Sequence, residues 1–482
     1  MRVYAFLVYF SVEAVYSQIL ISGNGYRTAL EMRQNLSEFV FDWDVMELDK
    51  VAENSTSLDC LVNWIFFLTS LKAKSSWALK ANPLEFLDPN RHGFLFQIIL
   101  QAVLAIDGFF VVSGFLVAYG FFRNSDSDSS PVLLGILKTF VYRLLRLLPT
   151  YAIVMAIYLG FWKYLGKGPF WKRDGVEVDQ CRSTWWTNLL FVNNFVDNFY
   201  NGSDGKEHRQ YCMEWTWSLA VEMQLFLASP LLLYPLRKAH SSFSGPIHVA
   251  WTWLTWLFIT LVALVSIAAT AAVHNSYDMP PNLFPPNLSL ASKAEAMASF
   301  VYYRPYAHLP SYLIGLIVGY LIATKQHRIA TSSSVMRTSC WVLATTIAGA
   351  SLFTIWPEYK GHVYAPWVST LYDSASRMGW SLSIGWLIFI CASKQKGIIQ
   401  SFLSWKFWRP LSRATYSTFL THPMLMIAYY YNRKQAIYYT DGTMVWFFGS
   451  FLLYGYLIGL LVHVLFEAPF LQIKELCTGT NK

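Results

Sequence analysis

The sequence predicts an all-helical membrane protein that crosses the bilayer about nine or ten times. Hydrophobic residues make up 55% of its 482 residues, and aromatic residues make up 17%. Charged residues make up only 14%, against about 25% in an ordinary soluble domain. A soluble fold of this length would need far more polar surface. The composition therefore excludes a typical cytosolic enzyme, a coiled coil and a disordered chain.

Nine segments are apolar enough to cross a membrane, for which roughly 20 mostly apolar residues are needed. They are 94–122, 147–162, 215–236, 249–273, 311–324, 340–356, 378–393, 415–431 and 446–466. Two of them, 147–162 and 311–324, are short and are expected to recruit flanking residues or to tilt less. The segment 60–71 is shorter still and ends at Lys72 and Lys74, so a tenth span stays open.

The chain divides into an N-terminal segment, 1–57, a membrane domain, 58–470, and a cytosolic tail, 471–482. Residues 1–17 have the apolar run and the small Ser17 of a signal peptide, although Glu13 lies within the run. If this segment is cleaved, Asn35 and Asn54 lie outside the cell or in a lumen, and 60–71 is not a span. If 60–71 does span, both asparagines are cytosolic.

Charge and sequons predict which ends of the spans face the cytosol. If 94–122 begins outside, the two long polar loops 163–214 and 274–310 are both external, and each holds a glycosylation sequon, at Asn201 and Asn287. The short segments on the other face carry most of the basic residues near the spans, as the positive-inside rule requires. The net charge of +8 is therefore assigned to the membrane surface and not to nucleic acid. The location is the plasma membrane or an endomembrane.

The external loop 163–214 contains Cys181 and Cys212. In an oxidising lumen these two residues are expected to form a disulfide. The alternative is two unrelated thiols.

Four residues inside the predicted spans are candidates for chemistry. Asp107, Glu222 and His422 are ionisable groups within apolar segments, where they are costly and therefore functional by default. Ser113 precedes Gly114, which lets a ligand or another backbone approach closely. The alternative role for each carboxylate is an intramembrane pair with an arginine or a histidine, and for His422 it is a histidine satisfied within the bundle.

Arg143 and Arg146 share one helix face at i, i+3 beside a predicted cytosolic membrane edge. Guanidinium groups bind phosphate bidentately. Coenzyme A offers a diphosphate and a ribose phosphate, so the pair is a candidate acyl-CoA site. Lipid head-group anchoring is the alternative.

Six segments resemble, in order, the motifs of one family. They read IDGFFVVSGFL at 106–116, YRLLRLLPTY at 142–151, CMEWTWSLAVEMQ at 212–224, PSYLIGL at 310–316, STFLTHP at 417–423 and FEAPF at 466–470. The chain is similar to the acyltransferase 3 superfamily from about residue 58 to 470, and within it to the animal group called nose resistant to fluoxetine.

The resemblance implies a fold of about ten helices that passes an acyl group from cytosolic acyl-CoA to a hydroxyl at or across the membrane. Animal members are associated with lipid and drug uptake. Asp107, Ser113, Glu222 and His422 would then form the catalytic site, and Arg143 and Arg146 would hold acyl-CoA. Membrane lipid and acyl-CoA are the expected partners, with acyl-CoA as co-substrate and no metal or other cofactor.

Three departures from the family pattern bear on catalysis. The family's first helix carries an arginine and a catalytic histidine, where this chain has Val62 and Ala73, and animal relatives carry a long Cys-bearing region before that helix which is missing here. His308 stands where relatives usually have an arginine. Without a base in reach of the hydroxyl, a contribution of about 10²–10⁴ to the rate is lost unless His92 or His422 substitutes.

These departures leave two other functions open beside acyl transfer. One is a binding or uptake protein that holds acyl-CoA with little or no turnover, or a truncated gene model of an active relative. The other is a secondary transporter, a class that usually shows internal repeats; none is visible in this sequence.

Overall fold

The computed structural model describes residues 94, 97–123, 132–167, 171, 176–196, 198–201, 207–210, 212–241, 246–283, 290–324, 333–393, 398–403, 405–435, 437–438 and 440–470. All of them belong to one unit, Thr56–Lys482. The expectations for 1–57, for the segment 60–71, for His92, for Asn287 and for the tail 471–482 lie outside the described residues.

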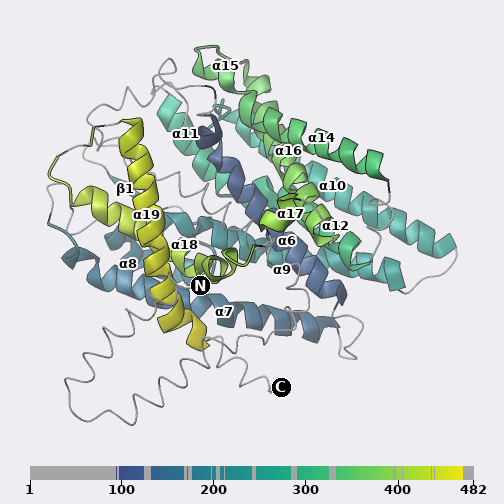
Figure 1. The fold of residues 1–482 in the computed structure, drawn as a ribbon, viewed down its shortest axis with the longest axis horizontal. Helices are drawn as coiled ribbons and strands as arrows, with labels where there is room; N and C mark the ends of the chain where they lie inside the picture. Colours follow the sequence, from purple (N-terminus) through teal and green to yellow (C-terminus); the bar gives the residue numbers. More distant parts are fainter. Residues whose placement is uncertain are drawn as a thin grey trace, which may run out of the picture. The chain divides into compact units, whose positions relative to one another are not determined.

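The fold is helical, as the sequence predicts, and the described residues hold eight helical segments long and apolar enough to cross a membrane (Figure 1). These are Ala102–Arg123, Leu137–Tyr164, Glu214–Ala239, Val249–Ser276, Pro305–Ala323, Ser334–Tyr359, Pro366–Ala392 and Gly442–Phe470. Each coincides with one of the nine predicted spans. The ninth prediction, 415–431, falls within helix α18, which is not among the eight.

The helices in chain order are α5 (Gln97–Leu100), α6 (Ala105–Arg123), α7 (Val132–Phe161), α8 (Val176–Leu189), α9 (Trp217–Ser241), α10 (Pro246–Ser276), α11 (Ala291–Met297), α12 (Pro305–Ala323), α14 (Ser334–Phe353), α15 (Trp356–Tyr359), α16 (Pro366–Ala392), α17 (Ile398–Leu403), α18 (Trp408–Tyr431) and α19 (Asp441–Val462). Short 3-10 or π turns adjoin several of them: η3 (Ala102–Leu104), η5 (Trp162–Tyr164), η6 (Glu214–Thr216), η8 (Ala298–Tyr302) and η9 (His463–Glu467).

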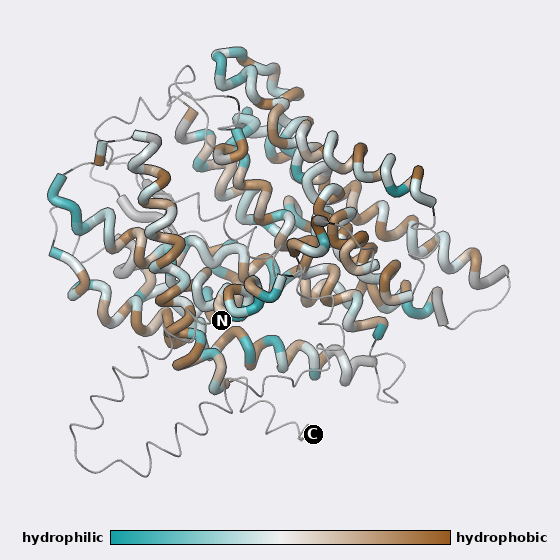
Figure 2. Tube along the Cα trace, in the orientation of Figure 1, coloured by the Kyte–Doolittle hydropathy of each residue, from teal (hydrophilic) through white to brown (hydrophobic). Residues whose placement is uncertain are grey.

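Burial separates central from peripheral helices. The span that contains α6 is 78% buried within the protein, whereas the spans that contain α14 and α19 are each 11% buried. Figure 2 shows that apolar residues nevertheless predominate along the long helices. Large apolar patches left open on a protein surface mark an apolar partner. Since these patches cover whole spans, that partner is the lipid bilayer.

Helix α10 illustrates this lipid-facing surface. Large apolar side chains that are more than half exposed recur at helical spacing along one face: Trp253, Leu254, Leu257, Leu261, Leu264 and Val265. The spacing of three and four residues places them on one stripe. A stripe of this kind would be costly in water, and it is suited to hydrocarbon.

Helices α6 and α12 pack backbone to backbone through glycine. A Cβ atom added at Gly114 would overlap the carbonyl oxygen of Tyr312, and one added at Gly315 would overlap that of Val111. Small residues allow such close helix approach in membranes, where packing rather than water exclusion drives association. This contact fixes the position of α6, which carries Asp107 and Ser113.

The predicted external loop 163–214 is partly ordered. It contains α8 and a two-stranded antiparallel hairpin, β1 (Asn198–Asn201) and β2 (Glu207–Gln210), in which Asn198 pairs with Gln210 and Asn201 with Glu207. Asn201, the predicted glycan acceptor, is therefore a strand residue beside the turn of the hairpin.

Helices α16 and α7 begin furthest ahead of the spans that hydropathy predicts. The seventh predicted span was placed at 378–393, but α16 begins at Pro366, so Asp373 and Arg377 lie inside the helix. Asp373 and Arg377 form an i, i+4 ion pair, with 3.0 Å between Nη2 and Oδ1. The charges lower local hydropathy, although each neutralises the other in the folded protein. Helix α7 likewise begins at Val132 and not near Leu147.

Candidate functional site

Three helices bring Ser113, Arg143 and Glu222 together, and we call these residues the Glu222 cluster. The Ser113 hydroxyl donates to Oε1 of Glu222 at 2.9 Å. Arg143 forms an ion pair with the same oxygen through Nη2, which also lies 3.4 Å from Ser113 Oγ. Ser113 is on α6, Arg143 on α7 and Glu222 on α9. The sequence predicted all three as site residues, and the alternative role for Glu222, an intramembrane pair with an arginine, is present in the structure with Arg143 as the partner.

The Arg143 guanidinium has two further ties. It lies 4.5 Å from the ring centroid of Phe226, one turn beyond Glu222 on α9, in a cation–π contact. It also interacts electrostatically with Tyr312 of α12. Glu222 is 7% exposed and Ser113 is 6% exposed, so the pair is shielded from solvent by protein. The ion pair between Arg143 and Glu222, together with Ser113 and Tyr312, links α6, α7, α9 and α12. Breaking a buried pair of this kind is costly.

Arg146 lies in a different environment. It is exposed, and it interacts electrostatically with Tyr416 of α18. The structure thus separates the two predicted phosphate ligands: Arg143 is bound to Glu222, and the Arg146 side chain remains accessible.

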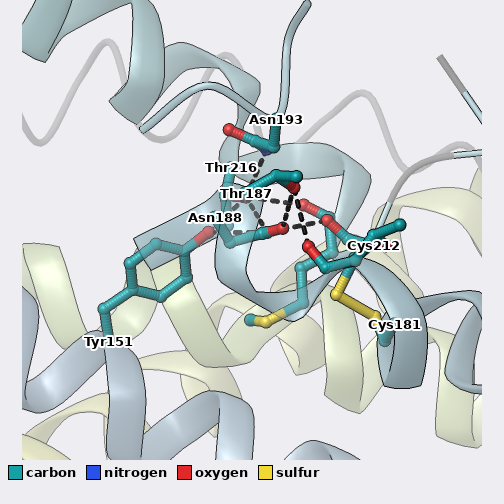
Figure 3. The surroundings of a disulfide bond; sticks show 9 residues. Tyr151, Cys181, Thr187, Asn188, Asn193, Cys212 and Thr216 are labelled. Carbon is teal, nitrogen blue, oxygen red and sulfur yellow. Dashed lines mark hydrogen bonds between the residues drawn. A yellow bond between two sulfur atoms is a disulfide. The ribbon is translucent and has the colours of Figure 1, made fainter. Parts of the chain in front are cut away.

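A disulfide-linked network holds the start of α9, and with it Glu222 (Figure 3). Cys181 at the middle of α8 is bonded to Cys212, just before α9. Asn188 donates through Nδ2 to the carbonyl oxygen of Cys212 and to the hydroxyl of Tyr151, both at 2.8 Å. Tyr151 in turn donates to Thr216 at 2.7 Å. The first turn of α9 is therefore tied to both α7 and α8.

A second buried cluster surrounds Asp107, and we call Asp107, His308, Ser311 and Ser381 the Asp107 cluster. His308 Nδ1 lies 2.7 Å from Oδ1 of Asp107. Ser311 donates to the same oxygen at 2.9 Å, and Ser381 donates to Ser311 at 2.8 Å. The cluster joins α6, α12 and α16. Asp107 and His308 are both fully buried.

The hydrogen bonds of His308 fix its tautomer. Nε2 lies 2.8 Å from the carbonyl oxygen of Tyr302. A carbonyl oxygen only accepts, so Nε2 must carry a hydrogen. Nδ1 faces Oδ1 of Asp107. The rings of Phe110, Trp217 and Tyr302 surround the imidazole at centroid distances of 4.8, 5.4 and 5.7 Å. Both ring nitrogens are thus occupied by partners within the protein, and neither is available as a catalytic base.

The two clusters lie at different depths along α6. Asp107 and Ser113 are six residues apart, which corresponds to about 9 Å along a helix axis. The sequence prediction placed both residues in one site. In the structure, Asp107 pairs with His308 and Ser113 with Glu222, without a contact between the two clusters among the described residues.

His422, the fourth predicted catalytic residue, lies on α18. Its Nδ1 is 3.0 Å from the carbonyl oxygen of Thr418, and its Cβ faces Gly455 of α19. In the described part of the chain, no hydrogen bond joins His422 to Ser113 or Glu222. A nearby acidic group, Glu467, accepts from Ser417 at 2.6 Å and lies 2.9 Å from His463 Nδ1. The structure leaves this region apart from the Glu222 cluster.

Several residues of these clusters escaped the sequence analysis as site residues. His308 was noted only as a departure from the family pattern, and Ser311 only as part of a motif. Asp373 and Arg377 lie between the predicted spans 340–356 and 378–393, in none of the six motifs. Helical spacing was the available signal, because an acidic and a basic residue at i, i+4 can share a face and neutralise each other. Among the described residues, no group of three or more His, Cys, Asp or Glu side chains could hold a metal ion.

Comparison with known families decides the classification. Residues 78–464 match the acyltransferase 3 family model, described as an acyltransferase domain. The chain belongs to the acyltransferase 3 family. Since the match covers most of the chain, including both buried clusters, the clusters are parts of an acyltransferase 3 membrane domain. No solved structure matches the chain.

Two curated relatives come from Caenorhabditis elegans. Nose resistant to fluoxetine protein 6 is 29% identical over 404 residues, which is 80% of this chain and 46% of that protein. Regulator of hypoxia-inducible factor 1 is 24% identical over 278 residues, which is 56% of this chain and 49% of that protein. The chain therefore spans about half the length of each of these two relatives.

Proposed function

We propose that this chain binds acyl-CoA from the cytosolic side of the membrane and transfers its acyl group to a hydroxyl-bearing acceptor, in connection with lipid or drug uptake. The Glu222 cluster carries the proposal. A serine hydroxyl that donates to a buried carboxylate has the arrangement of a nucleophile or hydroxyl-binding group next to a base. An arginine on the same carboxylate keeps that group in position. The acyltransferase family of the chain and its relation to the nose resistant to fluoxetine protein support the reaction class and the link with uptake.

The expected role of each group follows from its partners. Glu222 accepts the proton of an acceptor hydroxyl placed beside Ser113, and Arg143 orients the carboxylate. The phosphates of acyl-CoA bind first to Arg146, since its guanidinium is accessible while that of Arg143 is held by Glu222.

Replacement of Glu222 tests the catalytic role. In protein reconstituted into lipid nanodiscs, release of free coenzyme A from a long-chain acyl-CoA should exceed that of empty nanodiscs. Glu222→Gln should reduce this release by about 10²–10⁴-fold, the usual contribution of general acid–base catalysis. Glu467→Gln is the matched control, because Glu467 also accepts from a buried serine but lies outside the cluster. Equal loss in both variants would contradict the assignment.

A second candidate function is acyl-CoA binding without transfer. Two observations favour it: no described histidine hydrogen-bonds to Ser113 or Glu222, and the family's first-helix histidine is replaced by Ala73, which lies outside the described residues. The coenzyme A release assay separates the two functions. Binding of acyl-CoA without release supports the second, and absence of both binding and release excludes both.

Arg146 gives a prediction common to both functions. Arg146→Lys should weaken acyl-CoA binding by about tenfold although the charge is kept, because lysine lacks the planar fork that holds phosphate in two hydrogen bonds. Titration of a fluorescent acyl-CoA into nanodiscs measures the change. Arg337→Lys, at the start of α14, serves as control. If the Arg146→Lys variant binds acyl-CoA normally and only the Arg146→Gln variant binds it weakly, the positive charge alone matters. The role of Arg146 is then membrane anchoring.

The direction of the chain in the membrane is a prediction on which the cytosolic donor depends. Asn201 should carry a glycan when the protein is expressed in animal cells, and Asn201→Gln should remove a glycosidase-sensitive mobility shift. Asn287→Gln should remove a second shift, since both sequons lie in loops expected on the same face. If neither asparagine is glycosylated while Asn35 or Asn54 is, the proposed orientation is wrong.

A further inference from the structure

A small cavity lies between α10, α12 and α16, beside the Asp107 cluster. These three helices supply its lining residues: Ile267, Thr270, Ala307, Pro310, Ser311, Ser374, Arg377 and Met378. Ser311 belongs both to the cavity wall and to the Asp107 cluster, because its hydroxyl donates to Asp107. The cavity is therefore the point at which this buried polar cluster meets open space.

Arg377 has an unpaired hydrogen-bond donor at this cavity. The residue is only 6% exposed. Its Nε and Nη2 both donate to Oδ1 of Asp373, at 3.1 and 3.0 Å, and its guanidinium lies 5.4 Å from the ring centroid of Tyr302. Nη1 has no partner among the described residues. A buried donor left without a partner costs about 1–3 kcal/mol, and more when it is charged.

Unpaired acceptors lie in the same region. Oδ2 of Asp107 and Oδ2 of Asp373 are buried and without a hydrogen-bond partner in the described part of the chain, and so is the hydroxyl of Ser374. Buried polar groups are normally paired, and most buried polar side chains of this protein are. The unpaired atoms of Arg377 and Ser374 belong to residues that line the cavity. The unpaired oxygens belong to carboxylates that contact this lining, Asp107 through Ser311 and Asp373 through Arg377. A group bound in the cavity would supply the hydrogen bonds that Arg377 and Ser374 lack.

The charges around the cavity select the chemistry of that group. Arg377 interacts electrostatically with both Asp373 and Asp107, and Asp107 also faces His308. A bound anion would be repelled by the two carboxylates, and a bound cation would be repelled by Arg377. A hydroxyl is neutral, accepts from a guanidinium and donates to a carboxylate or to a serine. A hydroxyl therefore fits the charges around the cavity, because it is neutral, and the unpaired atoms, because it can both accept and donate a hydrogen bond.

We propose that the cavity lined by Ser311, Ser374 and Arg377 binds the hydroxyl group of a neutral lipid alcohol. The inference goes beyond the proposed function, because the cavity adjoins the Asp107 cluster and lies apart from the Glu222 cluster, where the acceptor hydroxyl of acyl transfer is placed. The expected orientation places the hydroxyl oxygen at Nη1 of Arg377 and its proton toward Ser374 or a free carboxylate oxygen. The apolar part of the alcohol would lie against Ile267 and Met378. Since the first residues of α12 and α16 belong to loops expected outside, the alcohol would bind in the external half of the membrane.

Thiol modification provides the test. Ser374→Cys is prepared in a background in which Cys60, Cys340, Cys391 and Cys477 are serine, and it is reacted in nanodiscs with methyl methanethiosulfonate. The rate is followed by intact-protein mass spectrometry in the presence of 1-octanol or of methyl octyl ether at equal membrane concentration. The ether accepts a hydrogen bond but cannot donate one. Ala375→Cys, the exposed neighbour on the same helix, is the control.

We expect 1-octanol to slow modification of Ser374→Cys by about tenfold, the effect of one hydrogen bond to a charged group, and the ether to have little effect. Neither compound should protect Ala375→Cys. The paired replacement Asp373→Asn with Arg377→Gln leaves no unpaired charge and should abolish the difference between the two compounds. Its thermal unfolding curve checks that it is folded.

Three results would overturn the proposal: equal protection by alcohol and ether, equal protection of the control cysteine, or no modification of Ser374→Cys, which would show that nothing reaches the cavity. No acyl-CoA is present in this assay. A failure here is therefore distinct from a failure of acyl transfer, which the coenzyme A release assay detects.

Discussion

Replacement of either Asp107 or His308 by leucine is expected to lower the free energy of unfolding by about 3–5 kcal/mol, the usual cost of removing one partner of a buried pair of ionisable groups. The two side chains are fully buried and 2.7 Å apart. Each single variant leaves the other group without its hydrogen-bond partner. The double variant removes both polar groups and should be destabilised by much less than the sum of the single variants.

Reversible unfolding in mixed micelles would measure this cycle. Ser381→Ala is the matched control, because it removes one hydrogen bond at the edge of the same cluster and should cost only about 1 kcal/mol. Additive effects of Asp107→Leu and His308→Leu would show that the two groups do not depend on each other. His308 would then not be the partner that stabilises Asp107 in the folded protein.

Replacement of Gly114 by alanine is expected to be similarly severe, with a loss of at least about 3 kcal/mol or failure to fold. The added methyl group would meet the backbone carbonyl of Tyr312 rather than a side chain that could turn away. Helices α6 and α12 would have to separate, and Ser113 and Asp107 would move with α6. Loss of the packing contact would thus affect both polar clusters together.

Gly120→Ala provides a control on the same helix. A Cβ atom at Gly120 has no neighbouring atom within 4 Å, so this variant should be neutral or slightly stabilising, since alanine favours a helix over glycine. Thermal unfolding of the two purified variants in one detergent compares them directly. Similar midpoints for Gly114→Ala and Gly120→Ala would show that α6 and α12 do not make the close backbone contact.

The sequence by itself determined the class of the protein. Hydropathy is a local property, so runs of apolar residues in the sequence located eight helices that the structure shows. Six motifs identified a family that the comparison confirms. The same reasoning marked Asp107 and Glu222 as unusual, because a polar group inside an apolar run has a cost that depends on its immediate neighbours in the chain. Ser113 was marked by the adjacent Gly114, and Arg143 by its i, i+3 spacing from Arg146.

Only the tertiary structure decided the partners of these groups. Asp107 pairs with a histidine 201 positions later in the chain, and Glu222 pairs with an arginine 79 positions earlier. Such contacts depend on which helix faces pack against each other, and hydropathy does not predict which faces these are. Asp373 and Arg377 are the clearest case. Their charges lower the hydropathy at the start of α16, so the predicted span begins only at residue 378, although the two charges cancel once the helix forms. The energy of a buried charge is set by what it faces in space, and neighbours in the sequence describe only part of that surrounding.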